Sequence, residues 1–151
     1  MKKLYFVLAM VTATFAFAQQ GSKKPLVLID GMLASAQLVE SDKKNVASTN
    51  TYNTAAKLPQ NLKTFESLAA QGITNVKVKE NYYDRITLAE LNTQFKLSPA
   101  NPVNFDGHII TNTDLVILGN VLEHMELGKY DGQEMLTIST TPRATSASAL
   151  K

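Results

Sequence analysis

The sequence predicts an α+β fold of two βαβ-type repeats, in which mixed sheets carry short helices packed on one side. The apolar run Leu26–Ile29 is closed by an Asp-Gly pair, which is typical of a buried strand entering a tight turn. Residues 73–79 alternate between apolar and polar side chains, as in a half-buried strand. Residues 62–71 instead repeat their apolar side chains at helical spacing. Strand-like and helix-like periods therefore occur in one chain of ordinary soluble composition, 44% hydrophobic and 19% charged.

The amino terminus has the layout of a secretory signal peptide. Residues 1–18 begin with Lys2 and Lys3, continue with an apolar stretch and end in Ala16-Phe17-Ala18, a small-x-small cleavage pattern. The apolar stretch is shorter than the roughly 20 residues that span a bilayer. We therefore expect cleavage after Ala18, a polar lead-in over residues 19–24 and a mature chain that does not span the membrane. The Ala-Phe-Ala-Gln-Gln ending is similar to signal peptides of the Bacteroidota.

The residue counts exclude several classes of protein. The chain has no cysteine, so we expect no lipoprotein anchor, no disulfide framework and no cysteine-ligated zinc. Its 15 lysines and arginines exceed its 13 aspartates and glutamates by the two lysines of residues 1–18, so we expect the mature chain to carry no net charge. Because the only basic clusters are Lys23-Lys24 and Lys43-Lys44, nucleic-acid binding lacks its electrostatic basis.

Residues 25–97 are expected to form one unit. Met32-Leu33 and Leu38-Val39 are candidates for a second strand after the first Asp-Gly turn, and residues 40–60 are polar enough for a long surface-loop insertion. The rest of the unit is expected to contain, in order, a helix over 62–71 stopped by Gly72, a strand over 73–79, and a helix over 87–95 with Thr87 and Glu90 at capping-box spacing.

Residues 98–141 are expected to form a second unit. A strand at residues 103–105 leads to another Asp-Gly pair, and Thr113 or Asp114 is placed to cap a helix through Leu122, although Val116-Ile117 also favours a strand. Two alternating strands follow, over 123–127 and 135–140. Residues 142–151 have no pattern, and we expect a disordered tail there.

The two units share one order of elements, which indicates an internal repeat. Residues 25–31 match residues 102–107 with one residue fewer, and residues 73–78 can be laid against residues 122–127. The alternative is chance, because apolar strands ending at Asp-Gly are common in α+β proteins.

The first strand and its Asp30-Gly31, the strand that leads to Asp106-Gly107, and the closing segment 130–138 together resemble the plug domain of TonB-dependent outer-membrane receptors. The resemblance implies two plug-like units, 25–97 and 98–141, in a small secreted protein of the Bacteroidota. The hairpin at Asp131-Gly132-Gln133 is shorter than the corresponding segment of the receptors. Since only residues 142–151 follow the last strand, we expect no barrel and no transport activity.

The three Asp-Gly pairs are the most prominent acidic positions. Carboxylates at turn tips can bind a divalent cation. Asp-Gly is, however, the usual two-residue hairpin turn, and the spacing lacks the acidic density of a calcium loop. We therefore expect Gly31, Gly107 and Gly132 to be turn glycines, and we expect no metal and no cofactor.

His108 and His124 are the only histidines, and neither lies in a recognisable catalytic or metal-binding motif. Tyr82, Tyr83 and Arg85 are candidate partner contacts, because tyrosine and arginine are enriched at binding hot spots. A simpler interpretation packs one tyrosine ring and exposes the other.

These features favour an exported, non-enzymatic interaction module of the cell envelope. We expect it to bind an envelope protein, such as a component of an outer-membrane complex, in the periplasm or at the outer membrane. The alternative is a small periplasmic enzyme or ligand-binding protein that uses His108 or His124 with nearby acids.

Overall fold

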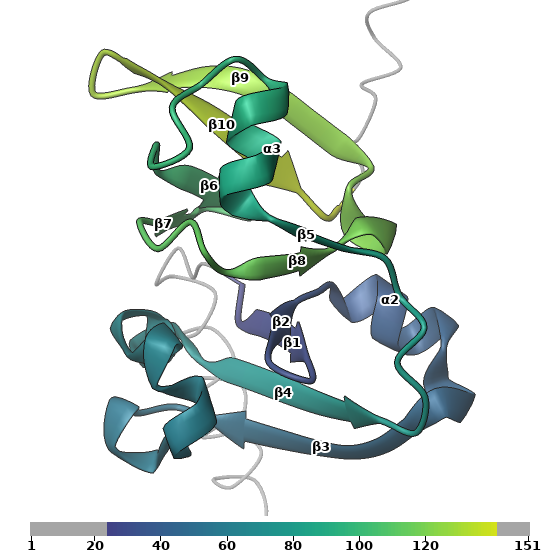
Figure 1. Cartoon of the computed structure of the whole chain (residues 1–151). Coiled ribbons are helices and arrows are strands. Elements are labelled where there is room, and N and C mark those ends of the chain that lie inside the picture. The colour runs from purple at the N-terminus through teal and green to yellow at the C-terminus, as the bar shows by residue number, and fades with distance from the viewer. Residues whose placement is uncertain (1–23, 142–151) are drawn as a thin grey trace, which may run out of the picture.

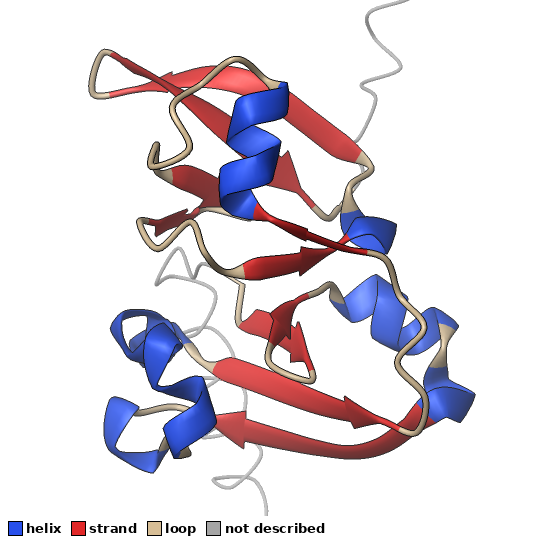
Figure 2. Cartoon of the chain, viewed as in Figure 1, coloured by secondary structure: helices blue, strands red, loops and turns tan. Residues whose placement is uncertain are grey.

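The computed structural model describes residues 24–141; the expected signal peptide, the lead-in up to residue 23 and the expected tail 142–151 lie outside the described residues. The fold is α+β, with two mixed sheets and a few short helices, as the sequence predicts (Figures 1 and 2). The strands are β1 Leu26–Ile29, β2 Met32–Leu33, β3 Val46–Tyr52, β4 Ile73–Val78, β5 Arg85–Thr87, β6 Val103–Phe105, β7 His108–Ile110, β8 Val116–Leu118, β9 His124–Tyr130 and β10 Gln133–Ser139. The α-helices are α2 Ala36–Ser41 and α3 Leu88–Gln94, and 3-10 helices span Lys43–Asn45, Ala55–Lys57, Gln60–Gln71 and Gly119–Val121.

The lower sheet in Figure 1 has the order β3-β4-β1-β2-β8-β5. Strand β1 lies inside this sheet, parallel to β4 and antiparallel to β2. A short, nearly continuous apolar run suits such an interior strand, because both of its faces are covered. Leu26, Leu28 and Ile29 are accordingly almost fully buried.

The upper sheet repeats the order of the first four strands of the lower sheet. Its order is β7-β6-β10-β9, with β6 parallel to β10 and antiparallel to β7, and with β10 antiparallel to β9. Strand β6 therefore corresponds to β1, β7 to β2, β9 to β3 and β10 to β4. By this correspondence β4, residues 73–78, matches β10 and not residues 122–127, so the alignment that we expected was wrong.

The same turn follows the first strand of each unit. Asp30 and Asp106 have φ angles of 48° and 49°, and the following Gly31 and Gly107 have 78° and 88°. Positive φ at both central residues is the requirement of a type I′ hairpin turn, which glycine meets without strain.

Each turn aspartate also binds the strand that runs parallel to the first strand of its own unit, β4 in the first unit and the end of β10 in the second. The amide of Asp30 donates to the carbonyl of Val76 at 2.8 Å, and the amide of Asp106 donates to the carbonyl of Ile138 at 2.9 Å. The Asp30 carboxylate then accepts from the amide of Val78 at 3.4 Å, and the Asp106 carboxylate accepts from the amide of Thr140 at 2.8 Å. Backbone and side chain together fix the end of the parallel pair in both units.

The two units share a sheet and a core. Strand β8 belongs to residues 98–141 by sequence, yet it pairs with β2 and β5 in the lower sheet. One cluster of buried side chains contains Leu28 and Phe65 from the first unit together with Phe105 and Leu136 from the second. The larger of two core clusters among the described residues is therefore built from both units.

Three segments differ from the sequence prediction. The expected loop over 40–60 contains β3, which pairs along its length with β4; its mostly exposed polar side chains suit an edge strand with little to bury. Leu38-Val39 lies in α2, whose first turn is capped by the Ser35 hydroxyl at 3.1 Å from the Leu38 amide. The helix expected after Thr113 is β8 followed by a 3-10 turn, because the β-branched Val116-Ile117 pair is held between two strands.

Two helical segments agree with the sequence prediction. Helix α3 has the complete capping box, with the Thr87 hydroxyl 3.1 Å from the Glu90 amide and the Glu90 carboxylate 2.8 Å from the Thr87 amide. The helical segment before Gly72 is present as the 3-10 helix Gln60–Gln71, with Leu62, Phe65 and Ala69 buried. No helix within residues 24–141 is long and apolar enough to cross a membrane.

We predict that Asp106→Ala lowers the free energy of unfolding by about 1–3 kcal/mol more than Asp131→Ala does. Both aspartates have φ of 49°, so alanine is equally strained at either position. Only Asp106 binds a distant segment, the amide and hydroxyl of Thr140. Urea unfolding of the two variants measures the difference, and equal losses would show that the Asp106 carboxylate does not stabilise the unit.

Candidate functional site

Tyr82 and Tyr83 differ sharply in exposure. Tyr83 is 7% exposed and packs in the smaller core cluster, whereas Tyr82 is 63% exposed. Their ring centroids lie 4.9 Å apart, and both hydroxyls donate to the Asp42 carboxylate. One ring is thus packed and the other lies at the surface, as in the simpler of our two interpretations.

These contacts shift the ionisation of all three side chains. The hydrogen bond from Tyr82, followed by the one from Tyr83, holds the pKa of Asp42 below its ordinary value. The same carboxylate raises the pKa of Tyr82 to about 12. Burial, and then the hydrogen bond to Asp42, raises the pKa of Tyr83. The cluster therefore stabilises the segment between β4 and β5 against the end of α2.

Arg85 and the turn glycines have separate locations. Arg85 is exposed on β5, an edge strand of the lower sheet, where it pairs with Leu118. Gly31, Gly107 and Gly132 all have positive φ and lie in three different hairpin turns. The residues named from the sequence do not converge on one site.

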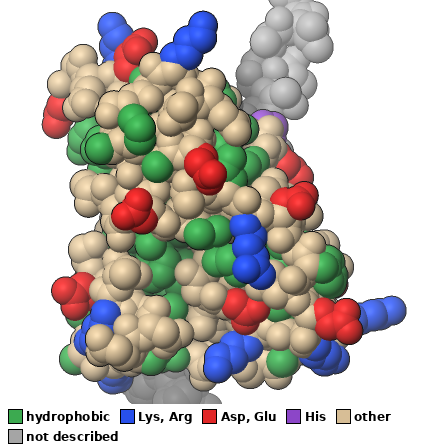
Figure 3. Space-filling view, in the orientation of Figure 1, with side chains coloured by type: hydrophobic (Ala, Val, Ile, Leu, Met, Phe, Trp, Pro, Cys, Tyr) green, Lys and Arg blue, Asp and Glu red, His purple; other side chains and the backbone are tan. Residues whose placement is uncertain are grey.

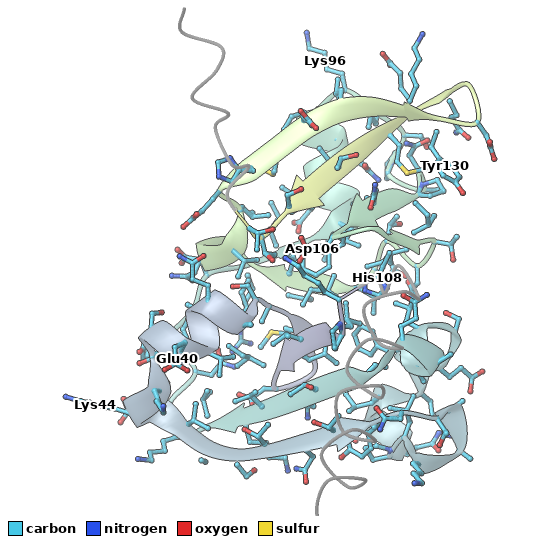
Figure 4. All side chains as sticks on the ribbon, turned by 180° about the vertical axis from the view of Figure 1, so that it is seen from behind. Glu40, Lys44, Lys96, Asp106, His108 and Tyr130 are labelled. Carbon is cyan, nitrogen blue, oxygen red and sulfur yellow. The ribbon has the colours of Figure 1, made fainter. Side chains whose placement is uncertain are left out.

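The two histidines also lie apart. His108 is 1% exposed, and its Nε2 lies 2.7 Å from the carbonyl oxygen of Lys24. Because a carbonyl can only accept, Nε2 carries the proton and donates it. His124 is exposed at the start of β9 and pairs with Ser139. Figure 4 shows His108 and Asp106 near each other between the two sheets.

The nearby acid of His108 is already engaged. The Asp106 carboxylate accepts from both the amide and the hydroxyl of Thr140. Among residues 24–141, no group of three or more histidines, aspartates or glutamates is placed to hold a metal ion. The arrangement around His108 therefore anchors the chain before β1 to β7.

Strand β9 forms an edge of the upper sheet and carries exposed apolar side chains. Its only strand partner within the described part of the chain is β10. Leu127 is 47% exposed and Tyr130 is 52% exposed, and they are two of the three large hydrophobic side chains exposed among the described residues. The alternation of Met125 and Leu127 predicted this strand, but its position at an edge depends on the sheet order, for which the sequence holds no local signal.

A groove of about 460 Å³ lies where the two units meet, and we call it the junction groove. Val27 and Val76 contribute from the lower sheet, Val39 from α2, and Phe105 from the upper sheet. Lys24, His108 and Thr141 also line it. Sequence reasoning missed the groove, because its lining comes from segments separated by more than a hundred residues.

We predict that Asp42→Asn lowers the pKa of Tyr82 from about 12 toward the ordinary tyrosine value near 10. The raised tyrosine pKa stabilises the fold below pH 10, and that contribution is lost as the pH rises toward 12. The lowered pKa of Asp42 acts at the other end, since its contribution is lost as the pH falls below the ordinary aspartate value. Absorbance titration of the tyrosinates measures this shift. Tyr130→Phe is the control, because it removes a tyrosine but leaves the raised pKa of Tyr82 in place. An unchanged titration curve in Asp42→Asn would contradict the hydrogen bond between Tyr82 and Asp42.

Comparison with protein-family models, with curated proteins and with solved structures found no match for this chain.

Proposed function

We propose that the protein is an exported, non-enzymatic interaction module of the cell envelope, and that it binds an extended segment of another envelope protein along β9. The observation that carries the proposal is the edge strand β9 with Leu127 and Tyr130 exposed. The signal-peptide layout and the resemblance to plug domains support a location in the periplasm or at the outer membrane.

The backbone of β9 offers hydrogen-bonding groups to an added strand. Tyr130 and Gln133 flank the two-residue turn at Asp131-Gly132, so they form a hydrogen-bonded pair in the hairpin. The pattern alternates, and the amides and carbonyls of Lys129, Leu127 and Met125 therefore point away from β10. An extended peptide that pairs with these groups would continue the upper sheet.

The exposed side chains favour strand addition over docking on one face. Leu127 lies opposite Leu136, and Tyr130 lies opposite Gln133. Because successive side chains of a strand alternate between faces, Leu127 and Tyr130 lie on opposite faces of the sheet. A partner covering one face would reach only one of them, whereas an added strand has cross-strand neighbours on both faces.

The distribution of surface charge does not favour a nucleic acid as the partner. Figure 3 shows acidic and basic side chains interspersed on the face that it displays, with hydrophobic surface between them. The mature chain is expected to be neutral. Nucleic-acid binding needs a concentrated basic surface.

The second candidate is the periplasmic enzyme or ligand-binding protein. The position of His108 on the junction groove favours it. The hydrogen bonds of His108 Nε2 to Lys24 and of Asp106 to Thr140 support the non-enzymatic proposal instead, because they give both side chains a structural role, and the remaining ring nitrogen, Nδ1, is buried with no hydrogen-bond partner among the described residues to orient it for proton transfer.

We predict that Lys129→Pro abolishes partner binding and that Lys129→Ser preserves it. Both variants remove the exposed lysine side chain, but only proline removes the outward amide and adds a ring that blocks an approaching strand. The measurement is photo-cross-linking in intact cells from a photoreactive residue at position 130, combined with each change at position 129. Cells are fractionated before analysis, and a photoreactive residue at the exposed Lys77 on β4 serves as the control position.

The expected result is one envelope protein cross-linked from position 130, retained with serine, lost with proline and absent from position 77. Retention with proline would contradict strand addition. A product of twice the chain's mass would identify a second copy as the partner and overturn the proposal of a different envelope protein.

A further inference from the structure

The junction groove has the size and lining of a small-molecule site. Pockets of roughly 300–1,000 Å³ with mostly apolar walls and a few polar groups are typical of such sites. Val27, Val39, Val76 and Phe105 give this groove of about 460 Å³ an apolar interior. It shares no residue with β9, so its use is independent of strand addition.

A cation lies on the lining of the groove without an acidic partner. Within residues 24–141, no carboxylate lies within ion-pair distance of the Lys24 ammonium group. Lys24 Nζ donates to the Thr141 hydroxyl at 3.2 Å. That hydroxyl keeps its own proton free to donate, so ammonium and hydroxyl together present donors to an anion.

The lysine is held in place by a buried side chain. The His108 ring donates to the Lys24 carbonyl at 2.7 Å and is itself almost completely buried. This contact ties the backbone of Lys24 to β7, which comes from the second unit. His108 therefore anchors the backbone from which the Lys24 side chain extends beside the groove.

The acidic residues of the lining already have hydrogen-bond or ion-pair partners. The Asp106 carboxylate accepts from Thr140. Glu40 forms an ion pair with Lys43 at 3.3 Å and lies well away from His108 in Figure 4. The Asp106 carboxylate keeps its negative charge, but it is oriented by Thr140 and lies beyond ion-pair distance of the Lys24 ammonium group, which therefore stays available to an added anion beside the apolar interior.

From this combination we propose that the junction groove binds an amphipathic monocarboxylate, with the carboxylate at Lys24 and Thr141 and the apolar body over Val27 and Val76. The anion gains charge-assisted hydrogen bonds, and the hydrocarbon leaves water. A neutral ligand of the same shape lacks the first contribution, and a cationic one is repelled by Lys24.

The test is isothermal titration of the mature chain, residues 19–151, with decanoate, decanol and decyltrimethylammonium below their micelle-forming concentrations. We expect saturable binding of one decanoate per chain, about tenfold tighter than that of decanol. Lys24→Gln should reduce decanoate affinity to that of decanol. Lys77→Gln is the matched control, because Lys77 is exposed on the face of β4 opposite Val76, and it should change nothing. Ala36→Trp places a large ring at an exposed position on the groove wall and should abolish binding.

Absence of saturable decanoate binding would overturn the proposal. Equal affinity for the three head groups, or an unchanged preference for decanoate in Lys24→Gln, would overturn the role of the lysine. Binding that survives Ala36→Trp would place the ligand elsewhere. Photo-cross-linking from β9 probes a different surface, so a negative result for either proposal does not contradict the other.

Discussion

The parallel pairing of β1 with β4 and of β6 with β10 is the interaction on which the rest of the structure depends. In a parallel pair the two strands need a long connection, and here the connections supply β2, α2 and β3 in the first unit and β7, β8 and β9 in the second. The pairing ends at an aspartate that uses its amide and its carboxylate on the same neighbouring strand, Asp30 in one unit and Asp106 in the other. A turn residue thereby connects positions that are distant in sequence.

The differences between the two units give the molecule its two candidate surfaces. Between β3 and β4 the chain adds the 3-10 helix Gln60–Gln71, which contributes to the core, whereas β9 and β10 are joined by a two-residue turn. Both β3 and β9 are edge strands, but of these two only β9 exposes large apolar side chains, Leu127 and Tyr130. Strand β8 crosses into the lower sheet and brings the units together, and the groove lined by both units lies where they meet.

Local signals in the sequence predicted the elements that local chemistry determines. The run Leu26–Ile29, the alternation at 73–78 and the Thr87–Glu90 capping box are all present. Strand β3 was not predicted, because its mostly polar side chains show no apolar alternation, although several of its residues favour strands; its pairing with β4 stabilises it. Val116-Ile117 became a strand because β2 and β5 flank it. The exposed edge and the groove follow from the order of strands in the sheets, which no local stretch of sequence encodes. The plug-like resemblance stays a prediction.

Native-state hydrogen exchange of the Asp30 and Asp106 amides tests most directly whether the parallel pairs hold the units together. The Asp30 amide donates to Val76 on β4 at 2.8 Å, and the Asp106 amide donates to Ile138 on β10 at 2.9 Å. If the pairs close a shared core, both amides exchange only through global unfolding, with opening free energies equal to the free energy of unfolding from urea denaturation. Exchange of either amide as fast as that of Gly132, at the tip of the hairpin between β9 and β10, would contradict the account.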